Sequence, residues 1–122
     1  MTPIYMDCAA TTPLVPEVRN EVLQYLDEDF GNAGSRTHEY GRRARAAVER
    51  ARDRVAAVAG ASRGDVVFTS GATESNNLAI LGLARHGEAC GRKHIISTAI
   101  EHHAVLEPLA ELERRGFEIE RL

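Results

Sequence analysis

Residues 66–81 read VVFTSGATESNNLAIL, in which a short apolar run is followed by a glycine turn and then by a helical pattern. The β-branched and aromatic residues at its start favour a strand over 66–69, because such side chains pack well on a pleated sheet. After Gly71, apolar residues recur at helical spacing, which predicts a helix over 73–86 that stops at Gly87. The stretch therefore predicts a strand, a tight turn and the start of a helix.

The same order of elements recurs towards the C-terminus. The run HIIST at 94–98 is a second strand signal, and the apolar spacing over 105–115 predicts a helix closed by Gly116. Residues 117–122 begin a third strand. Helices of this length between strands imply parallel pairing, so the fold class is α/β. Three strands are few for a sheet covered on both faces, and we expect the chain to be the front part of a longer fold.

Two helices are expected in the N-terminal half of the chain. The first begins at Pro16, which suits a first helical turn, and ends before Phe30. The second covers 42–59, where alanines and arginines surround an apolar stripe, and Gly60 closes it. We expect its arginines to form a solvated face. The loop between the helices, 31–38, has two glycines and no apolar period, as functional loops often do.

These elements divide the chain into three parts. Residues 1–15 form an extended segment and a loop, residues 16–60 hold the two helices, and residues 61–122 form the first part of an α/β domain. The loop in the first part, DCAATTP at 7–13, is rich in small and hydroxyl-bearing residues, and its proline breaks regular structure.

The composition is that of an ordinary globular protein, and it narrows the classes of function. Of the 122 residues, 43% are hydrophobic and 27% are charged, and a net charge of -3 offers no basic field for a nucleic-acid backbone. There is neither a signal-peptide pattern nor an apolar run of membrane-spanning length, so we expect a cytoplasmic protein without a direct nucleic-acid or membrane partner. Cys8 and Cys90 are isolated, and we expect both to be buried free thiols.

The turn Ser70-Gly71-Ala72-Thr73 is the first candidate binding site. Parallel sheets place ligands at the carboxyl ends of their strands, where helix N-termini present unpaired N–H groups and a positive dipole end. Gly71 allows close approach of an anion such as phosphate, and the N–H groups of Ala72 and Thr73 can donate to it. The hydroxyls of Ser70 and Thr73 are further donors. The alternative is that one of these hydroxyls only caps the helix.

The second candidate site is Glu101-His102-His103-Ala104, which follows the next strand at the same edge of the sheet. An imidazole there can stack on a flat heteroaromatic ring whose phosphate lies in the first turn. A metal site is not predicted, because adjacent side chains diverge and the HExxH spacing is absent. A plain helix start is the alternative, but the two motifs together favour a bound cofactor.

Four stretches carry a resemblance to a known family. DCAATTP at 7–13, FGNAGS at 30–35 followed by His38, TSGATESNNLAI at 69–80 and EHHAVLEP at 101–108 resemble the N-terminal part of the cysteine desulfurases. These are enzymes of the class V aminotransferase superfamily that depend on pyridoxal 5'-phosphate (PLP). The resemblance implies the type I fold of PLP-dependent transferases, a three-layer α/β/α arrangement with a mainly parallel sheet, which is incomplete in this chain.

The resemblance also implies roles for single residues. Ala72 and Thr73, next to Gly71, would bind the cofactor phosphate, and His102 would stack on the pyridine ring. In the family, the N-terminal loop and the loop between the two helices line the active site near the subunit interface. Four further residues are therefore secondary candidates, namely Ala10, Thr11, Asn32 and His38.

The activity that the resemblance implies is the conversion of L-cysteine to L-alanine. The sulfur passes to an enzyme cysteine as a persulfide and then to iron–sulfur cluster or thio-modification pathways, which implies a sulfur-acceptor protein and a homodimer. The Schiff-base lysine, the acidic partner of the pyridine nitrogen and the persulfide cysteine belong to later segments in the family. No catalytic residue is therefore predicted here, and the chain alone is expected to be inactive. Lys93, the only lysine, precedes its strand and is expected at the surface.

Two alternatives stay open. Another class V PLP enzyme, an aminotransferase or a selenocysteine lyase, fits the same motifs, because the residues that would decide the substrate lie outside them. A truncated, non-catalytic assembly module, which pairs with intact subunits through its N-terminal helices, is the alternative from another class.

Overall fold

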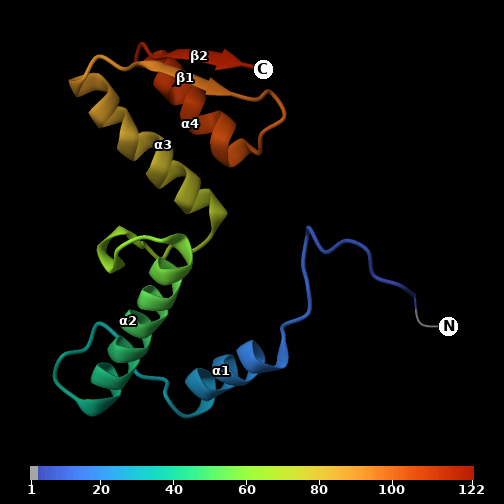
Figure 1. The fold of residues 1–122 in the computed structure, drawn as a ribbon, viewed down its shortest axis with the longest axis vertical. Coiled ribbons are helices and arrows are strands. Elements are labelled where there is room, and N and C mark those ends of the chain that lie inside the picture. The colour runs from blue at the N-terminus through green and yellow to red at the C-terminus, as the bar shows by residue number, and fades with distance from the viewer. Residues whose placement is uncertain (1–2) are drawn as a thin grey trace. The chain divides into compact units, whose positions relative to one another are not determined.

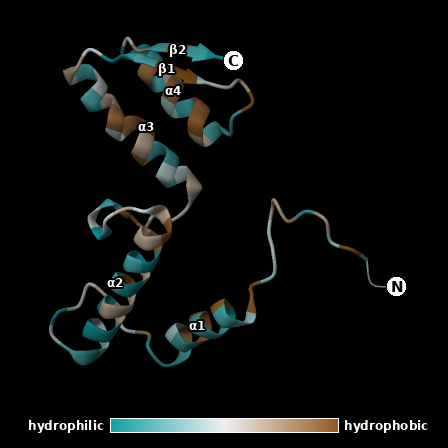
Figure 2. Ribbon diagram, in the orientation of Figure 1, coloured by the Kyte–Doolittle hydropathy of each residue, from teal (hydrophilic) through white to brown (hydrophobic). Residues whose placement is uncertain are grey.

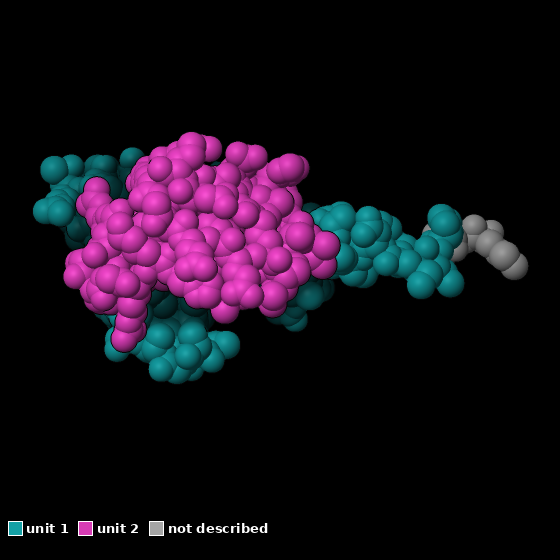
Figure 3. Space-filling view, turned by 90° about the horizontal axis from the view of Figure 1, so that it is seen from above, with its two compact units in different colours: residues 1–66 teal, residues 67–122 magenta. Residues whose placement is uncertain are grey.

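The computed structural model describes residues 3–122 and divides the chain into two compact units (Figure 1). Unit 1 is Met1–Val66 and unit 2 is Val67–Leu122, coloured separately in Figure 3. Unit 1 contains the two predicted N-terminal helices, and unit 2 contains both candidate binding motifs. The finer division into three parts stays a prediction.

Unit 1 consists of α1 (Pro16–Asp27), α2 (Glu39–Ala59) and the short 3-10 helix η1 (Arg63–Asp65). Both predicted helices are confirmed. Helix α2 begins earlier than the apolar pattern indicated, because the His38 side chain caps it by accepting a hydrogen bond from the backbone N–H of Gly41. It ends as predicted at Gly60, whose φ of 63° lies in the left-handed region that favours glycine.

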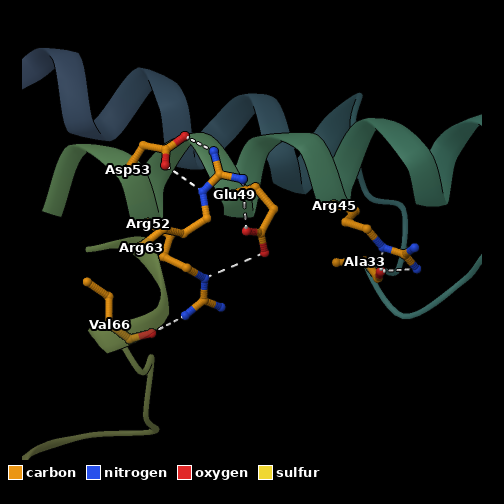
Figure 4. A network of polar contacts seen from close by, with 7 residues as sticks. All are labelled: Ala33, Arg45, Glu49, Arg52, Asp53, Arg63 and Val66. Carbon is orange, nitrogen blue, oxygen red and sulfur yellow. Dashed lines mark hydrogen bonds and ion pairs between the residues drawn. The ribbon is translucent and has the colours of Figure 1, made fainter. Parts of the chain in front are cut away.

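The prediction of a solvated arginine face on α2 is wrong for part of the helix. Figure 4 shows Arg45 against the carbonyl of Ala33, and Arg52 donates to the carbonyl of Val66. Arginine carries five donors in a planar fork, so it can bind main-chain oxygens that an apolar period does not reveal.

An exposed ion pair joins the C-terminal half of α2 to η1. Arg63 on η1 donates to the Asp53 carboxylate, with an Nε to Oδ1 distance of 2.6 Å (Figure 4). This hydrogen bond lowers the pKa of Asp53 below its ordinary value. The pair is exposed, and we assign it no large share of the stability.

Unit 2 consists of α3 (Ala72–Ala89), β1 (His94–Ser97), α4 (His103–Arg114) and β2 (Glu118–Arg121). The two strands pair in parallel, with Ile95 opposite Ile119, so the α/β class and the parallel pairing are confirmed. The core is formed by Ala84, Leu112 and Phe117, against which apolar residues of α3 and both strands pack. Figure 2 shows apolar residues on both α3 and α4, consistent with helices that cover a sheet.

The predicted strand over 66–69 is wrong. Val66 has an extended backbone, with φ of -93° and ψ of 122°, but the segment pairs with neither strand of the sheet in the described part of the chain. Side-chain preference can make a backbone extended, whereas a strand also needs a hydrogen-bonded neighbour. The run Val66 to Leu81 is therefore an extended segment, a turn and a helix.

The predicted helix stop at Gly87 is also wrong, because α3 continues to Ala89. Gly87 is buried, and a Cβ atom there would lie 2.5 Å from the carbonyl oxygen of Arg92. This glycine therefore allows close packing, and Gly91, with φ of 69°, makes the turn instead.

Both cysteines are exposed, contrary to the predicted burial. Cys8 lies in the turn that follows the N-terminal segment, and Cys90 follows the last residue of α3, so neither lies on an apolar face of an element. The Cys90 thiol donates to the carbonyl oxygen of His86 at 2.7 Å. Within residues 3–122, no helix combines the length and the apolar character needed to cross a membrane.

Candidate functional site

The N-terminus of α3 carries the first candidate motif. Gly71 is the N-cap, Ala72 and Thr73 are the first two helical residues, and no side chain caps this end. The first N–H groups of a helix have no partner within the helix, so these amides are free to donate to an anion. The alternative that Ser70 or Thr73 caps the helix is therefore wrong.

Open space lies over Gly71. A Cβ atom built on this glycine would meet nothing within 4 Å. The φ of 162° and ψ of -178° describe an extended backbone, which any residue adopts. Neither the backbone nor the packing of unit 2 therefore requires glycine at this position, and the space over it is open.

Glu74 holds the turn that precedes α3. Its Oε2 accepts from the Ser70 N–H at 2.6 Å and from the Ser70 hydroxyl at 2.7 Å. These hydrogen bonds, first the one from the backbone and then the one from the side chain, lower the pKa of Glu74. Because its proton is directed to Glu74, the Ser70 hydroxyl is not the free anion donor that the sequence predicted.

A second pair of hydroxyls supports the same turn. The hydroxyl oxygens of Thr69 and Ser75 lie 2.6 Å apart, and the Ser75 hydroxyl also lies 3.2 Å from the carbonyl oxygen of Gly71. The turn is thus held from both sides by its own side chains. Its backbone amides are left pointing out of the helix end.

His102 carries the second candidate motif and is the N-cap of α4. Its Nδ1 accepts from the Ala104 N–H at 3.0 Å, so the neutral ring that makes this bond carries its proton on Nε2. The alternative that residues 101–104 form a helix start is confirmed, because His102 caps α4. The residue is exposed, however, and its ring remains open to a stacking partner.

Asn77 links the two helix starts, and the sequence analysis missed it. Pro108 lies inside α4 and has no N–H, so the carbonyl oxygen of Ala104 lacks its usual donor four residues on. The Asn77 side-chain nitrogen lies 3.5 Å from that oxygen and 2.9 Å from the carbonyl oxygen of Thr73. This contact lies between α3 and the start of α4, where His102 is the N-cap. The only signal in the sequence was the proline itself.

The four secondary candidates belong to unit 1. Ala10 and Thr11 lie in an exposed turn, in which both amides donate to the carbonyl oxygen of Asp7 at 3.1 and 3.4 Å. Asn32 accepts from the Gly34 N–H through its side-chain oxygen at 2.8 Å, and His38 caps α2. Asn32 and His38 thus fix the local shape of one loop.

In the part of the chain that the structure describes, no metal cluster lies beside these residues, and the one lysine is exposed. Within residues 3–122, no group of three histidine, cysteine, aspartate or glutamate side chains is placed to hold a metal ion. Lys93 is exposed and lies before β1, at the end of the strand away from the start of α4. Its exposure confirms the predicted surface position, and its ammonium nitrogen lies 5.7 Å from the centre of the Phe117 ring.

Comparison with known proteins gives a consistent result. The family described as aminotransferase class-V matches residues 4–122. A protein of Dechloromonas aromatica called cysteine desulfurase IscS is 52% identical over 116 residues, which cover 95% of this chain and 29% of that protein. The chain thus spans about 29% of the length of this relative.

Two solved structures are also similar. The crystal structure of DndA from Streptomyces lividans has a TM-score of 0.79 and 56% identity, and the match covers 98% of this chain and 33% of DndA. A structure described as SspA in complex with cysteine has a TM-score of 0.82 and 37% identity, and covers 97% of this chain and 33% of SspA.

Proposed function

Because the chain belongs to the aminotransferase class-V family, we propose that its protein is a PLP-dependent cysteine desulfurase. The reaction would convert L-cysteine to L-alanine and transfer the sulfur to an enzyme cysteine as a persulfide. The name of the relative from Dechloromonas aromatica supports this activity, and the cysteine in the SspA complex supports the substrate. The observation that carries the proposal is the uncapped start of α3 beside the exposed His102 of α4.

The residues of unit 2 fit the phosphate group of PLP. The amides of Ala72 and Thr73 are free donors at the positive end of the α3 dipole, and a dianion is the ligand that such a site favours. The open space over Gly71 leaves room for phosphate oxygens close to the backbone. We therefore assign Gly71, Ala72 and Thr73 to the phosphate.

The assignment of His102 to the cofactor ring rests on its ring geometry. The hydrogen bond from the Ala104 amide fixes one edge of the imidazole, and the residue is otherwise exposed. A fixed flat ring is a good stacking surface, since little side-chain freedom is lost on binding. When bound, PLP would draw electrons from the substrate carbon, while His102 would hold the plane of the pyridine ring.

The remaining parts of the function are proposals by family resemblance. Ala10, Thr11, Asn32 and His38 would border the substrate, and a second copy of the chain would complete a homodimer. The acceptor of the sulfur would be a protein of an iron–sulfur cluster or thio-modification pathway. The cytoplasmic location predicted from the sequence stays a prediction.

An assay of the native protein tests the proposed function. The protein is purified, supplied with PLP, and offered L-cysteine, L-selenocysteine, or an amino acid with an oxo acid, while alanine and protein-bound persulfide are measured. Alanine and persulfide from L-cysteine are expected. Preferential release of selenium would support a selenocysteine lyase, and amino-group transfer to the oxo acid an aminotransferase. Cofactor binding without any turnover would favour the assembly module.

A further inference from the structure

The loop at 31–38 lies directly on the first turns of α2. A Cβ atom on Gly31 would lie 2.3 Å from the carbonyl oxygen of Tyr40, and one on Gly41 would lie 2.5 Å from the carbonyl oxygen of Ser35. Both distances are too short for any side chain, so the two backbones touch where these glycines stand. The loop is therefore a packed structure within unit 1.

Arg45 holds the middle of this loop. Its Nε and Nη2 lie 3.1 and 3.0 Å from the carbonyl oxygen of Ala33 (Figure 4). Nη2 also lies 3.3 Å from the carbonyl oxygen of Gly34 and 3.2 Å from that of Ser35. One guanidinium thus binds three successive carbonyl groups, and a charged donor makes each such bond stronger than a neutral one does.

The two candidate residues of the loop stand on either side of these carbonyls. Asn32 forms the turn that leads into them, because its backbone oxygen accepts from the Ser35 N–H at 3.0 Å. His38 ends the loop as the N-cap of α2, with its Nδ1 3.2 Å from the Gly41 nitrogen. Movement of the segment between them would change the separation of these two side chains.

Arg45 differs from its neighbours in having no carboxylate partner in the described part of the chain. Arg42 pairs with Glu39, and Arg43 pairs with Asp29, which is only 8% exposed. Removal of Arg43 would leave a buried carboxylate without its cation, whereas removal of Arg45 leaves no such charge. The contacts of Arg45 go to the loop backbone, so its substitution leaves no carboxylate without a cation.

We propose that Arg45 is a positioning residue that fixes the loop at 31–38, so that Asn32 and His38 keep the geometry they need beside the substrate. The part concerning the substrate rests on the proposed function. Lysine cannot replace arginine here, because Nη2 alone reaches all three carbonyl oxygens and the lysine side chain is one atom too short to place its nitrogen there. Arg45→Lys should therefore behave almost like Arg45→Ala.

The test uses the native protein and a matched control on the same helix. Amide hydrogen exchange is followed in the wild type, Arg45→Lys, Arg45→Ala and Arg42→Ala, the last of which loses an exposed pair with no loop contact. We expect the Gly34 and Ser35 amides to exchange about tenfold faster in both Arg45 variants, and unchanged in Arg42→Ala. Unchanged exchange in the Arg45 variants would overturn the proposal. Melting temperatures identify a variant that is unfolded.

Steady-state kinetics separate positioning from a role in stability alone. The KM for L-cysteine should rise about three- to tenfold in both Arg45 variants, because substrate must then order the loop, while kcat stays within about twofold. Faster exchange with an unchanged KM would overturn the substrate part of the proposal. An inactive wild type would instead contradict the proposed function. The hydrogen-exchange result would still test whether Arg45 fixes the loop at 31–38.

Discussion

The two helix starts in unit 2 differ in what closes them. At α4 the His102 ring accepts from a backbone amide of the first turn, whereas α3 begins at a glycine that offers no side chain. Both helices carry the same kind of positive dipole end, so the difference lies in what is left available. An uncapped start can accept an anion, while a start capped by a fixed imidazole presents a flat ring. The two neighbouring helix starts thus present different chemistry.

A negative charge introduced at the first helical position should have the largest effect, because it should lower PLP affinity at the start of α3 and not at that of α4. Ala72→Asp places a carboxylate at the start of α3, which is favourable for the helix dipole but repels a phosphate dianion. We expect stability to be unchanged or slightly raised and PLP affinity to fall about 100-fold, since like charges in contact cost several kcal/mol. Titration with PLP and chemical denaturation measure the two effects.

His103→Asp is the matched control, because His103 is the first helical residue of α4. It should change PLP affinity less than about threefold, since the capped helix start is not the proposed phosphate site. Equal losses in the two variants would mean that charge acts over the whole unit and that the two starts are equivalent.

Substitution of His102 should distinguish capping from ring stacking. His102→Ala loses the cap of α4 and the ring, so we expect a loss of about 1 kcal/mol in unfolding free energy and about five- to tenfold in PLP affinity. His102→Asn keeps a good cap and should recover stability without recovering affinity. His103→Ala, at an exposed neighbour, should leave both unchanged. Recovery of PLP affinity in His102→Asn would contradict the stacking role.

Loss of the contact between the two helix starts should have a smaller effect. Asn77→Ala leaves the carbonyl oxygen of Ala104 without its side-chain donor, which should lower the unfolding free energy by about 0.5 to 1 kcal/mol. PLP affinity should fall in parallel if the start of α3 and His102 bind the same cofactor, because Asn77 contacts both helix starts. Asn76→Ala is the matched control for the loss of an asparagine side chain. Equal destabilisation in both variants would mean that the contact of Asn77 with the Ala104 carbonyl, which Pro108 leaves without its usual donor, contributes nothing specific.

The smallest expected effect is a dependence on pH at the turn before α3. Hydrogen bonds from the backbone and the side chain of Ser70 hold the pKa of Glu74 below the ordinary glutamate value. The stabilisation is therefore present at neutral pH and is lost as the pH falls below that value towards the folded-state pKa. Glu74→Gln cannot titrate, so the gap in unfolding free energy between it and the wild type should narrow on acidification. A gap that is constant between pH 6 and about pH 3 would contradict the assignment.

Local patterns predicted the helices well and failed where a distant partner decides the structure. The apolar spacing after Pro16 and over 42–59 is enough to predict α1 and α2, because a helix satisfies its own backbone. The run at 66–69 predicts a strand that does not form, since strand pairing depends on residues far along the chain. Gly87 predicts a helix stop, but its close packing against a later turn is not visible in the sequence.

The same limit applies to the candidate site. The candidate residues of the turn before α3, and His102, follow from the rule that helix starts favour anions and flat ligands, although the segment before that turn does not join the sheet. Asn77 could not be found in this way, because its partner on α4 is 27 residues away along the chain. The contacts of Glu74 were missed for a different reason. A glutamate in a first helical turn is commonplace, and only geometry shows that it occupies the Ser70 hydroxyl.

We propose that the start of α3, and not that of α4, binds the phosphate of PLP. The most direct test is to follow the backbone amide resonances of Ala72, Thr73, His103 and Ala104 while the native protein is titrated with PLP or with pyridoxal, which lacks the phosphate. PLP should shift the Ala72 and Thr73 amide resonances strongly, pyridoxal should not, and the α4 amides should respond weakly to both. Equal shifts at the two helix starts, or the same response to pyridoxal, would contradict the proposal.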